Sequence, residues 1–226
     1  MIVLFALIGV LTGWLLNLVG DYLLRFASEP VQAVRGVQPP ALLAILSSQR
    51  VSPNGAVRVA SELITGVLFA ALYLLHDVTA QTLLLMGMCA LFVLIAIMDA
   101  KYRLVLNVLT YPGILLALIV NLMILHQPVL NIILGVAFAF GLFYITALVR
   151  PGGLGGGDVK LAAFIGAIFG FPHVLWALIA AAFVSAVIIA GMLISRRFTL
   201  QHSLPYAPFL CLGAIVILIY NSIMMV

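Results

Sequence analysis

The chain has 226 residues, of which 66% are hydrophobic and 7% are charged, whereas about 25% are charged in soluble domains. A water-soluble core of this length cannot bury so much apolar surface, and the apolar content also excludes a disordered chain. The composition therefore predicts an all-α, polytopic protein of the lipid bilayer. Cys89 and Cys211 lie inside apolar runs and indicate neither a disulfide framework nor a zinc motif.

Apolar runs of near 20 residues predict about eight transmembrane helices. The runs cover residues 1–24, 59–76, 79–98, 107–125, 129–149, 159–171, 173–195 and 206–225. The sixth is short, and we expect a tilted helix there or one whose Lys160 side chain extends to the interface. The sizeable loop at about 26–57 carries no domain of its own, so residues 1–226 are expected to form a single membrane-embedded domain.

The distribution of charge predicts the orientation of these helices. Alternating the eight helices places all ten Lys and Arg residues on one side of the bilayer, which is the cytoplasmic side by the positive-inside rule. The loop at 26–57 is then cytoplasmic, and both termini lie outside the cytoplasm in a multi-pass protein of the cytoplasmic membrane. Because topology accounts for the net charge of +4, the lipid bilayer is an expected partner and nucleic acid is not.

Two of the six acidic residues are expected at the cytoplasmic border of their helices. Asp99 ends the third apolar run, and Asp158 follows the glycine-rich stretch 152–157. Carboxylates at membrane depth are costly and are functional candidates by default. The structural alternatives are an N-cap role for Asp158 and ion pairing of Asp99 with Lys101 or Arg103.

The other acids and the histidines indicate less specialised roles. Asp21 is spaced to pair with Arg25 on one helix face, and Glu29 and Asp77 are expected in solvated loops. Glu62 is expected at the start of the second helix, where it contacts a basic substrate segment or caps the helix. The four histidines are not spaced as metal ligands, so no metal site is expected.

The residues around both aspartates resemble a known family. Residues Gly155–Asp158 fit the GxGD signature of intramembrane aspartyl proteases, and the continuation through Lys160 is similar to the type IV prepilin peptidases. Asp99 is followed, in that family's register, by Asn107, Leu109, Thr110 and Pro112. Further similar stretches occur in the same order at Leu16-Asn17, Glu62–Gly66 and Pro205–Phe209. Met98 before the first aspartate makes presenilin-like enzymes the weaker match.

The resemblance implies an aspartic endopeptidase with Asp99 and Asp158 as its catalytic residues and no cofactor for proteolysis. The implied substrate is a prepilin-like precursor, cut between its basic leader and its hydrophobic helix at the cytoplasmic face of the membrane. The family also implies methylation of the new N-terminus with S-adenosylmethionine, which the reduced first loop of this chain leaves open.

The chain departs from the family pattern at two places. Residues 26–57 contain no cysteine, so the zinc module that bacterial members commonly carry in this loop is absent. Val105-Leu106 replaces an Ile/Leu-Pro pair before Asn107, which we expect to loosen the turn after Asp99. Two functions of other classes remain as alternatives: a small transporter or channel with an acidic pair, and an inactive peptidase-like scaffold.

Overall fold

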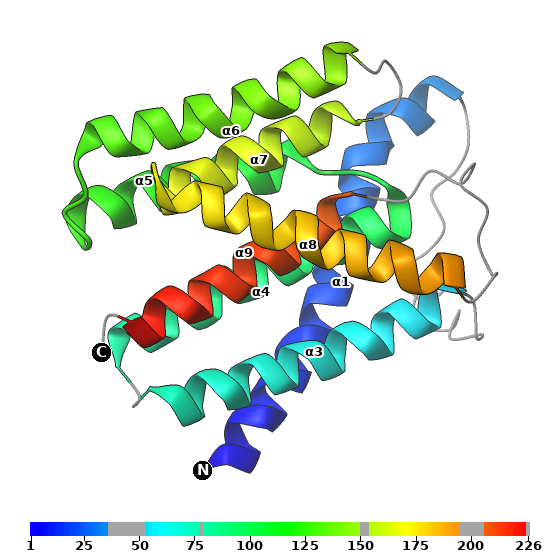
Figure 1. The fold of residues 1–226 in the computed structure, drawn as a ribbon. Helices are drawn as coiled ribbons and strands as arrows, with labels where there is room; N and C mark the ends of the chain where they lie inside the picture. The colour runs from blue at the N-terminus through cyan, green and yellow to red at the C-terminus, as the bar shows by residue number, and fades with distance from the viewer. Residues whose placement is uncertain (36–52, 77–78, 150–153, 195–205, 225–226) are drawn as a thin grey trace. The chain divides into compact units, whose positions relative to one another are not determined.

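The computed structural model describes residues 1–35, 53–76, 79–149, 154–194 and 206–224 (Figure 1). These residues form α-helices and no strand, which confirms the all-α prediction. The helices are α1 (Ile2–Arg35), α3 (Pro53–Leu75), α4 (Ala80–Tyr102), α5 (Asn107–Met123), α6 (Val129–Val149), α7 (Gly156–Phe169), α8 (His173–Ile194) and α9 (Ala207–Met224). The chain divides into two compact units, Met1–Ile97 and Met98–Val226, and each is described by itself.

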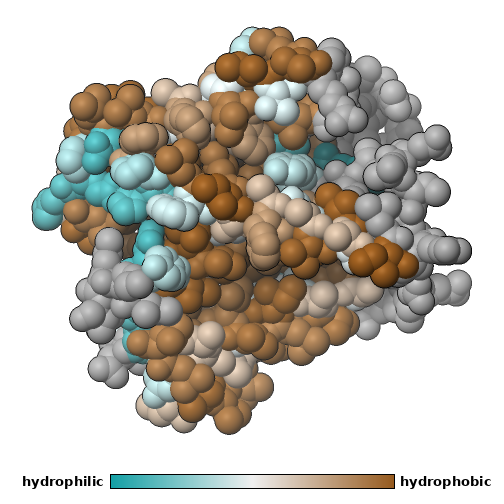
Figure 2. Space-filling view, in the orientation of Figure 1, coloured by the Kyte–Doolittle hydropathy of each residue, from teal (hydrophilic) through white to brown (hydrophobic). Residues whose placement is uncertain are grey.

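The helices are those of a multi-pass membrane protein. Five are long and apolar enough to span a bilayer: Ile2–Leu23, Gly55–Leu75, Ala80–Tyr102, Val129–Val149 and His173–Gly191. Two shorter apolar helices cover Asn107–Met123 and Ala207–Asn221. Hydrophobic side chains cover most of the described surface that is visible in Figure 2.

The sixth expected helix is α7, and it is short. Its 14 residues extend about 21 Å at the usual helical rise, whereas the hydrocarbon core of a bilayer is about 30 Å thick. The expectation of eight helices is therefore met in number within the described residues, but five of them have the length of a full span.

The loop expected at 26–57 is helical at both ends. α1 continues to Arg35 and α3 already begins at Pro53. Residues 26–35 contain the helix formers Ala, Glu, Gln and Arg together with Pro30, which disfavours a helix interior. Pro53 occupies the first helical position, where its missing N–H costs nothing. The apolar runs therefore underestimated the lengths of α1 and α3. Residues 36–52 between them lie outside the described residues.

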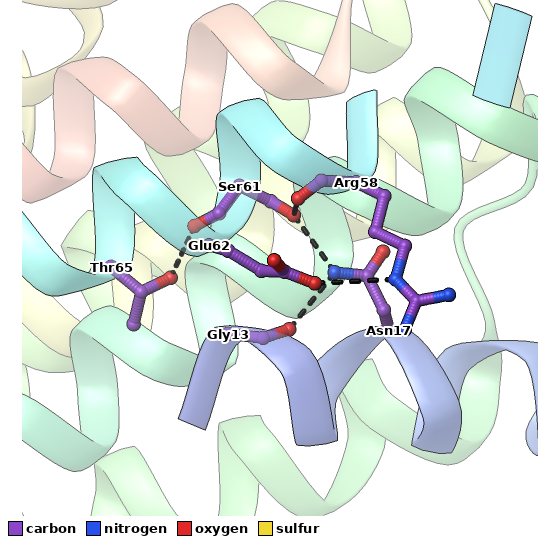
Figure 3. A network of polar contacts seen from close by, with 6 residues as sticks. All are labelled: Gly13, Asn17, Arg58, Ser61, Glu62 and Thr65. Carbon is purple, nitrogen blue, oxygen red and sulfur yellow. Dashed lines mark hydrogen bonds and ion pairs between the residues drawn. The ribbon is translucent and has the colours of Figure 1, made fainter. Parts of the chain in front are cut away.

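In the first unit, α1 and α3 pack against each other, and a polar network joins them (Figure 3). The Asn17 amide Nδ2 of α1 donates to the Ser61 hydroxyl of α3 and to the Gly13 carbonyl, both at 2.9 Å. Ser61 and Thr65 in turn donate to carbonyl oxygens of α3 at 2.7 Å. Such interhelical hydrogen bonds hold apolar helices together where lipid removes the hydrophobic driving force.

In the second unit, α7 is the central helix. It packs against α5, α6, α8 and α9, and its residues from Asp158 to Phe169 are buried apart from Lys160. α6 approaches α7 so closely that a Cβ built on Gly135 would lie 2.7 Å from the Gly166 carbonyl oxygen. Asn121 of α5 donates from Nδ2 to the Ala167 and Ile168 carbonyls at 2.8 and 3.0 Å, so it satisfies two of the acceptors that the last turn of α7 leaves unpaired.

Candidate active site

Asp99 lies in the last turn of α4, where the helix leaves its apolar surroundings. Its side chain is 6% exposed, and its carboxyl accepts a hydrogen bond from the Ala207 amide at the start of α9. The other oxygen, Oδ2, is buried without a hydrogen-bond partner among the described residues. Arg103 follows with a positive φ of 54° and interacts electrostatically with Asp99, in line with the expected proximity of a basic residue.

Asp158 lies in the first turn of α7 and outside the five candidate spans. Gly155 is the N-cap residue, so Asp158 is not itself the cap; instead its Oδ2 accepts from the Gly155 N–H at 3.2 Å. Burial raises the pKa of the Asp158 carboxyl above its ordinary value, and the hydrogen bond from Gly155 opposes that rise. The positive end of the helix dipole also favours a carboxylate in this turn.

The two carboxylates come from separate helix ends to one place in the second unit. Asp99 and Asp158 interact electrostatically with each other. Cys211, which is fully buried in α9, interacts electrostatically with both of them. The ends of α4 and α7 and the first turns of α9 therefore surround one pair of buried acids.

The turn after Asp99 packs directly on the residue before Asp158. A Cβ built on Gly157 would lie 2.8 Å from the Val105 Cβ, a separation that real Cβ atoms do not adopt. By contrast, a Cβ on Gly156 would meet nothing within 4 Å. The packing of Val105 fixes the turn that the loss of the family's proline was expected to loosen, and it explains why the second glycine of the GxGD signature is needed while the position before it is free.

Tyr206 is a site residue that the sequence reasoning did not single out. Its ring lies 5.9 Å from that of Phe143 in α6, its hydroxyl is hydrogen-bonded to Ser185 of α8, and it interacts electrostatically with Asp158. Burial raises the pKa of the Tyr206 hydroxyl, which therefore stays protonated. The available signal was a tyrosine hydroxyl inside the stretch Pro205–Phe209, which resembles a stretch of the type IV prepilin peptidases.

The other four acidic residues belong to the first unit, Met1–Ile97, whereas the aspartate pair belongs to the second. Glu62 lies in the third turn of α3, not at its start, because α3 begins at Pro53; its Oε1 is 3.2 Å from Nε of Arg58. The side chain of Arg25, the expected partner of Asp21, lies outside the described part of the chain, and so do the side chains of Glu29 and Asp77. Within the described ranges, no group of three or more His, Cys, Asp or Glu residues is arranged to hold a metal ion.

Comparison with known proteins gives a family for the region that carries both aspartates. Residues 86–194 match the Type IV leader peptidase family. The chain is 27% identical over 166 residues to a prepilin leader peptidase/N-methyltransferase of Bacillus subtilis (strain 168), over 72% of this chain and 66% of that relative. It is 28% identical over 176 residues to a protein of the same name from Burkholderia pseudomallei (strain 1026b), over 76% of this chain and 57% of that relative. No solved structure matches the chain significantly.

These helices and this site define a multi-pass membrane protein with a buried pair of interacting carboxylates. Over residues 86–194, the chain is similar to the type IV leader peptidase family. The matched parts cover 66% and 57% of the two relatives, so the chain spans less than two thirds of their length.

Proposed function

We propose that this protein is a membrane-embedded aspartyl endopeptidase that cleaves the basic leader from prepilin-like precursors. The observation that carries the proposal is the pair of buried carboxylates, Asp99 and Asp158, which two separate helix ends bring within electrostatic reach of each other. The match of residues 86–194 to the Type IV leader peptidase family and the names of the two relatives support the same substrate class.

The surroundings of the two acids suggest different roles for them. Two neighbouring carboxylates resist joint ionisation, so one proton is shared and the pair titrates in two steps. The Gly155 N–H and the start of α7 stabilise a negative charge on Asp158, which favours Asp158 as the general base. Asp99 then keeps the proton, and its unpartnered Oδ2 is the oxygen able to donate it.

Peptide hydrolysis follows from this division of roles. Asp158 takes a proton from a water molecule while the water oxygen bonds to the scissile carbonyl carbon. Asp99 donates a hydrogen bond to the carbonyl oxygen and stabilises the charge that develops there. The carbon–nitrogen bond then breaks as a proton passes to the leaving amine, giving a carboxylate on the leader and a free N-terminus on the mature protein. These steps use only water and the two side chains.

The proposed topology puts this chemistry at the cytoplasmic face of the membrane. We infer that all eight apolar segments, with the sixth short, are accommodated in the cytoplasmic membrane as one peptidase domain over residues 1–226. The basic residues and the segment 26–57 are then cytoplasmic, and both termini are outside the cytoplasm. In this arrangement the end of α4 and the start of α7 lie where a basic leader meets the hydrophobic helix of its precursor.

Methyl transfer is a separate hypothesis, because the relatives' names include N-methyltransferase. The described polar side chains between α1 and α3 are bonded to one another, Asn17 to Ser61 and Arg58 to Glu62. We therefore derive no methyl-transfer step from these residues.

The test is leader release from a purified prepilin-like substrate in detergent micelles or membranes. Asp99→Asn and Asp158→Asn should each abolish cleavage, and the double variant should be no worse than either single one, since residues that act as a unit are not additive. Asp77→Asn, between α3 and α4 in the sequence, is the matched control and should cleave as wild type does. Clear cleavage by either single variant would contradict the pair and favour a transporter or scaffold.

A further inference from the structure

A lysine next to one aspartate reaches the segment that follows the other. The Lys160 ammonium donates to the Asn107 side-chain oxygen at 2.8 Å, and it lies 5.6 Å from the ring centroid of Tyr111. Lys160 stands two residues after Asp158 in α7, and Asn107 is the first residue of α5, eight residues after Asp99. The contact therefore joins the two aspartate-bearing segments across 53 residues of sequence.

A second contact runs beside this bridge. The turn from α4 to α5 places Val105 in the space next to Gly157, so one packing contact and one hydrogen bond tie that turn to the first turns of α7. The packing contact restrains the turn in the direction of Gly157. The Lys160 bridge holds the far end of the turn, where α5 begins.

The bridge matters more for the geometry of the site than for the stability of the fold. A hydrogen bond from a charged donor is stronger than one between neutral groups, and the face of Tyr111 adds a cation–π attraction. The bridge is solvent-accessible, so it adds little to overall stability. Catalysis is far more sensitive to geometry, because a displacement of about 1 Å at the reacting groups can cost about 100-fold in rate.

We propose that Lys160 is a positioning residue that, by binding Asn107 and Tyr111, holds the Asp99 turn in register with Asp158. The proposal rests on the proposed peptidase function and adds a specific role for the lysine two residues after the GxGD signature. In this role Lys160 contacts neither the substrate nor the attacking water molecule; it acts through the relative placement of the two carboxylates.

The first test is kinetic and uses leader release by the full-length protein. Lys160→Met and Asn107→Leu should each lower kcat about tenfold, with KM within about twofold of wild type. The kcat of the double variant should equal that of the less active single variant. Lys160→Arg, which keeps a charged donor and stacks on aromatic faces, should recover most of kcat. Thermal unfolding of all these variants should stay close to wild type. Lys101→Met, which removes a lysine near Asp99, is the control for loss of charge and should show no such coupling to Asn107→Leu.

The second test needs no activity. Asp99→Cys and Asp158→Cys are introduced together after Cys89 and Cys211 are replaced by alanine, and the new pair is cross-linked with a short thiol-specific reagent. We expect rapid cross-linking, slowed several-fold by adding Lys160→Met and not by adding Lys101→Met. Cross-linking that is equally fast with Lys160→Met overturns the role of Lys160 while leaving the carboxylate pair intact. No cross-linking with or without Lys160→Met overturns both the carboxylate pair and the role of Lys160. An additive loss of kcat in the Lys160 and Asn107 variants overturns the role of Lys160 alone.

Discussion

Val105 occupies the space that a side chain on Gly157 would need, with only 2.8 Å between its Cβ and a Cβ built on that glycine. This places the residue before Asp158 in direct contact with the turn that follows Asp99. The contact predicts that the same substitution has different effects at Gly156 and at Gly157.

Gly157→Ala should lower leader cleavage at least tenfold, because Val105 or the first turn of α7 must move to admit the methyl group, and proximity effects are steep. Gly156→Ala adds the same methyl group where nothing lies within 4 Å and should retain activity close to wild type. The two variants are compared by kcat for leader release at equal folded protein. Equal activities of the two variants would show that Val105 does not control the placement of Asp158.

Gly166→Ala should destabilise the second unit by about 1–3 kcal/mol, the usual cost of forcing atoms into a packed interior. A Cβ at this position would overlap the backbone of Gly135 in α6. Gly141→Ala in α6 has open space around it and should be neutral or slightly stabilising, because alanine favours helix over glycine. Thermal unfolding in detergent checks both variants, and an unchanged midpoint for Gly166→Ala would contradict the close approach of α6 and α7.

Tyr206→Phe should fold, because the phenylalanine ring keeps the packing against Phe143. It removes a hydroxyl that is hydrogen-bonded to Ser185 and lies within electrostatic reach of Asp158, and less polar surroundings favour the neutral form of a carboxyl. The acidic limb of the pH profile for kcat should therefore move to higher pH, with kcat reduced a few-fold at its lower end. Tyr144→Phe, at an exposed position of α6, is the control, and superimposable profiles for Tyr206→Phe and wild type would remove Tyr206 from the site.

The raised pKa of Asp158 predicts how stability depends on pH. The carboxyl ionises near its ordinary pKa of 3.8 in the unfolded chain, and burial raises that pKa in the folded protein. Between the two values the folded state binds more protons, so its stability falls as pH rises through that window. Asp158→Asn has no charge to bury and should unfold a few degrees above wild type at pH 7, with the difference vanishing below about pH 3.8. A variant less stable than wild type at pH 7 would contradict this.

The proposed topology is checked with reporter tags. Because all ten basic residues fall on one side when eight segments alternate, tags at residues 40, 103 and 200 should report the cytoplasm. A tag at residue 127 should report the opposite side. Residues 40 and 127 on the same side of the membrane would require a different number of crossings.

Local sequence was sufficient for the helical class and for placing the two aspartates at helix ends. Asp99 ends an apolar run and Asp158 follows glycines, and both signals are read within a few residues. Whether a helix faces lipid was harder to predict, because α7 is apolar on all sides after Lys160, and hydropathy alone does not separate a helix buried among other helices from one that faces lipid.

The contacts that complete the site come from residues far apart in the chain. Val105 meets Gly157, Lys160 meets Asn107, and Tyr206 interacts with Asp158. None of these pairs has a spacing that a period of 3.6 residues could reveal. The sequence motifs marked the segments that matter, and only the packing of α7 among its neighbours showed which side chains within them meet.

The anchoring of α7 has a consequence for which precursors the proposed peptidase is able to cut. Asn121 holds the last carbonyls of α7, and Val105 bears on its first turn, so this helix is fastened at both ends. A peptide carbonyl inside a helix is already engaged by a backbone N–H and is closed to attack, and a fastened α7 has little freedom to adapt to it. The substrate helix must therefore unwind at the cleavage site. We expect faster cleavage of precursors whose helix is least stable at the junction with the leader.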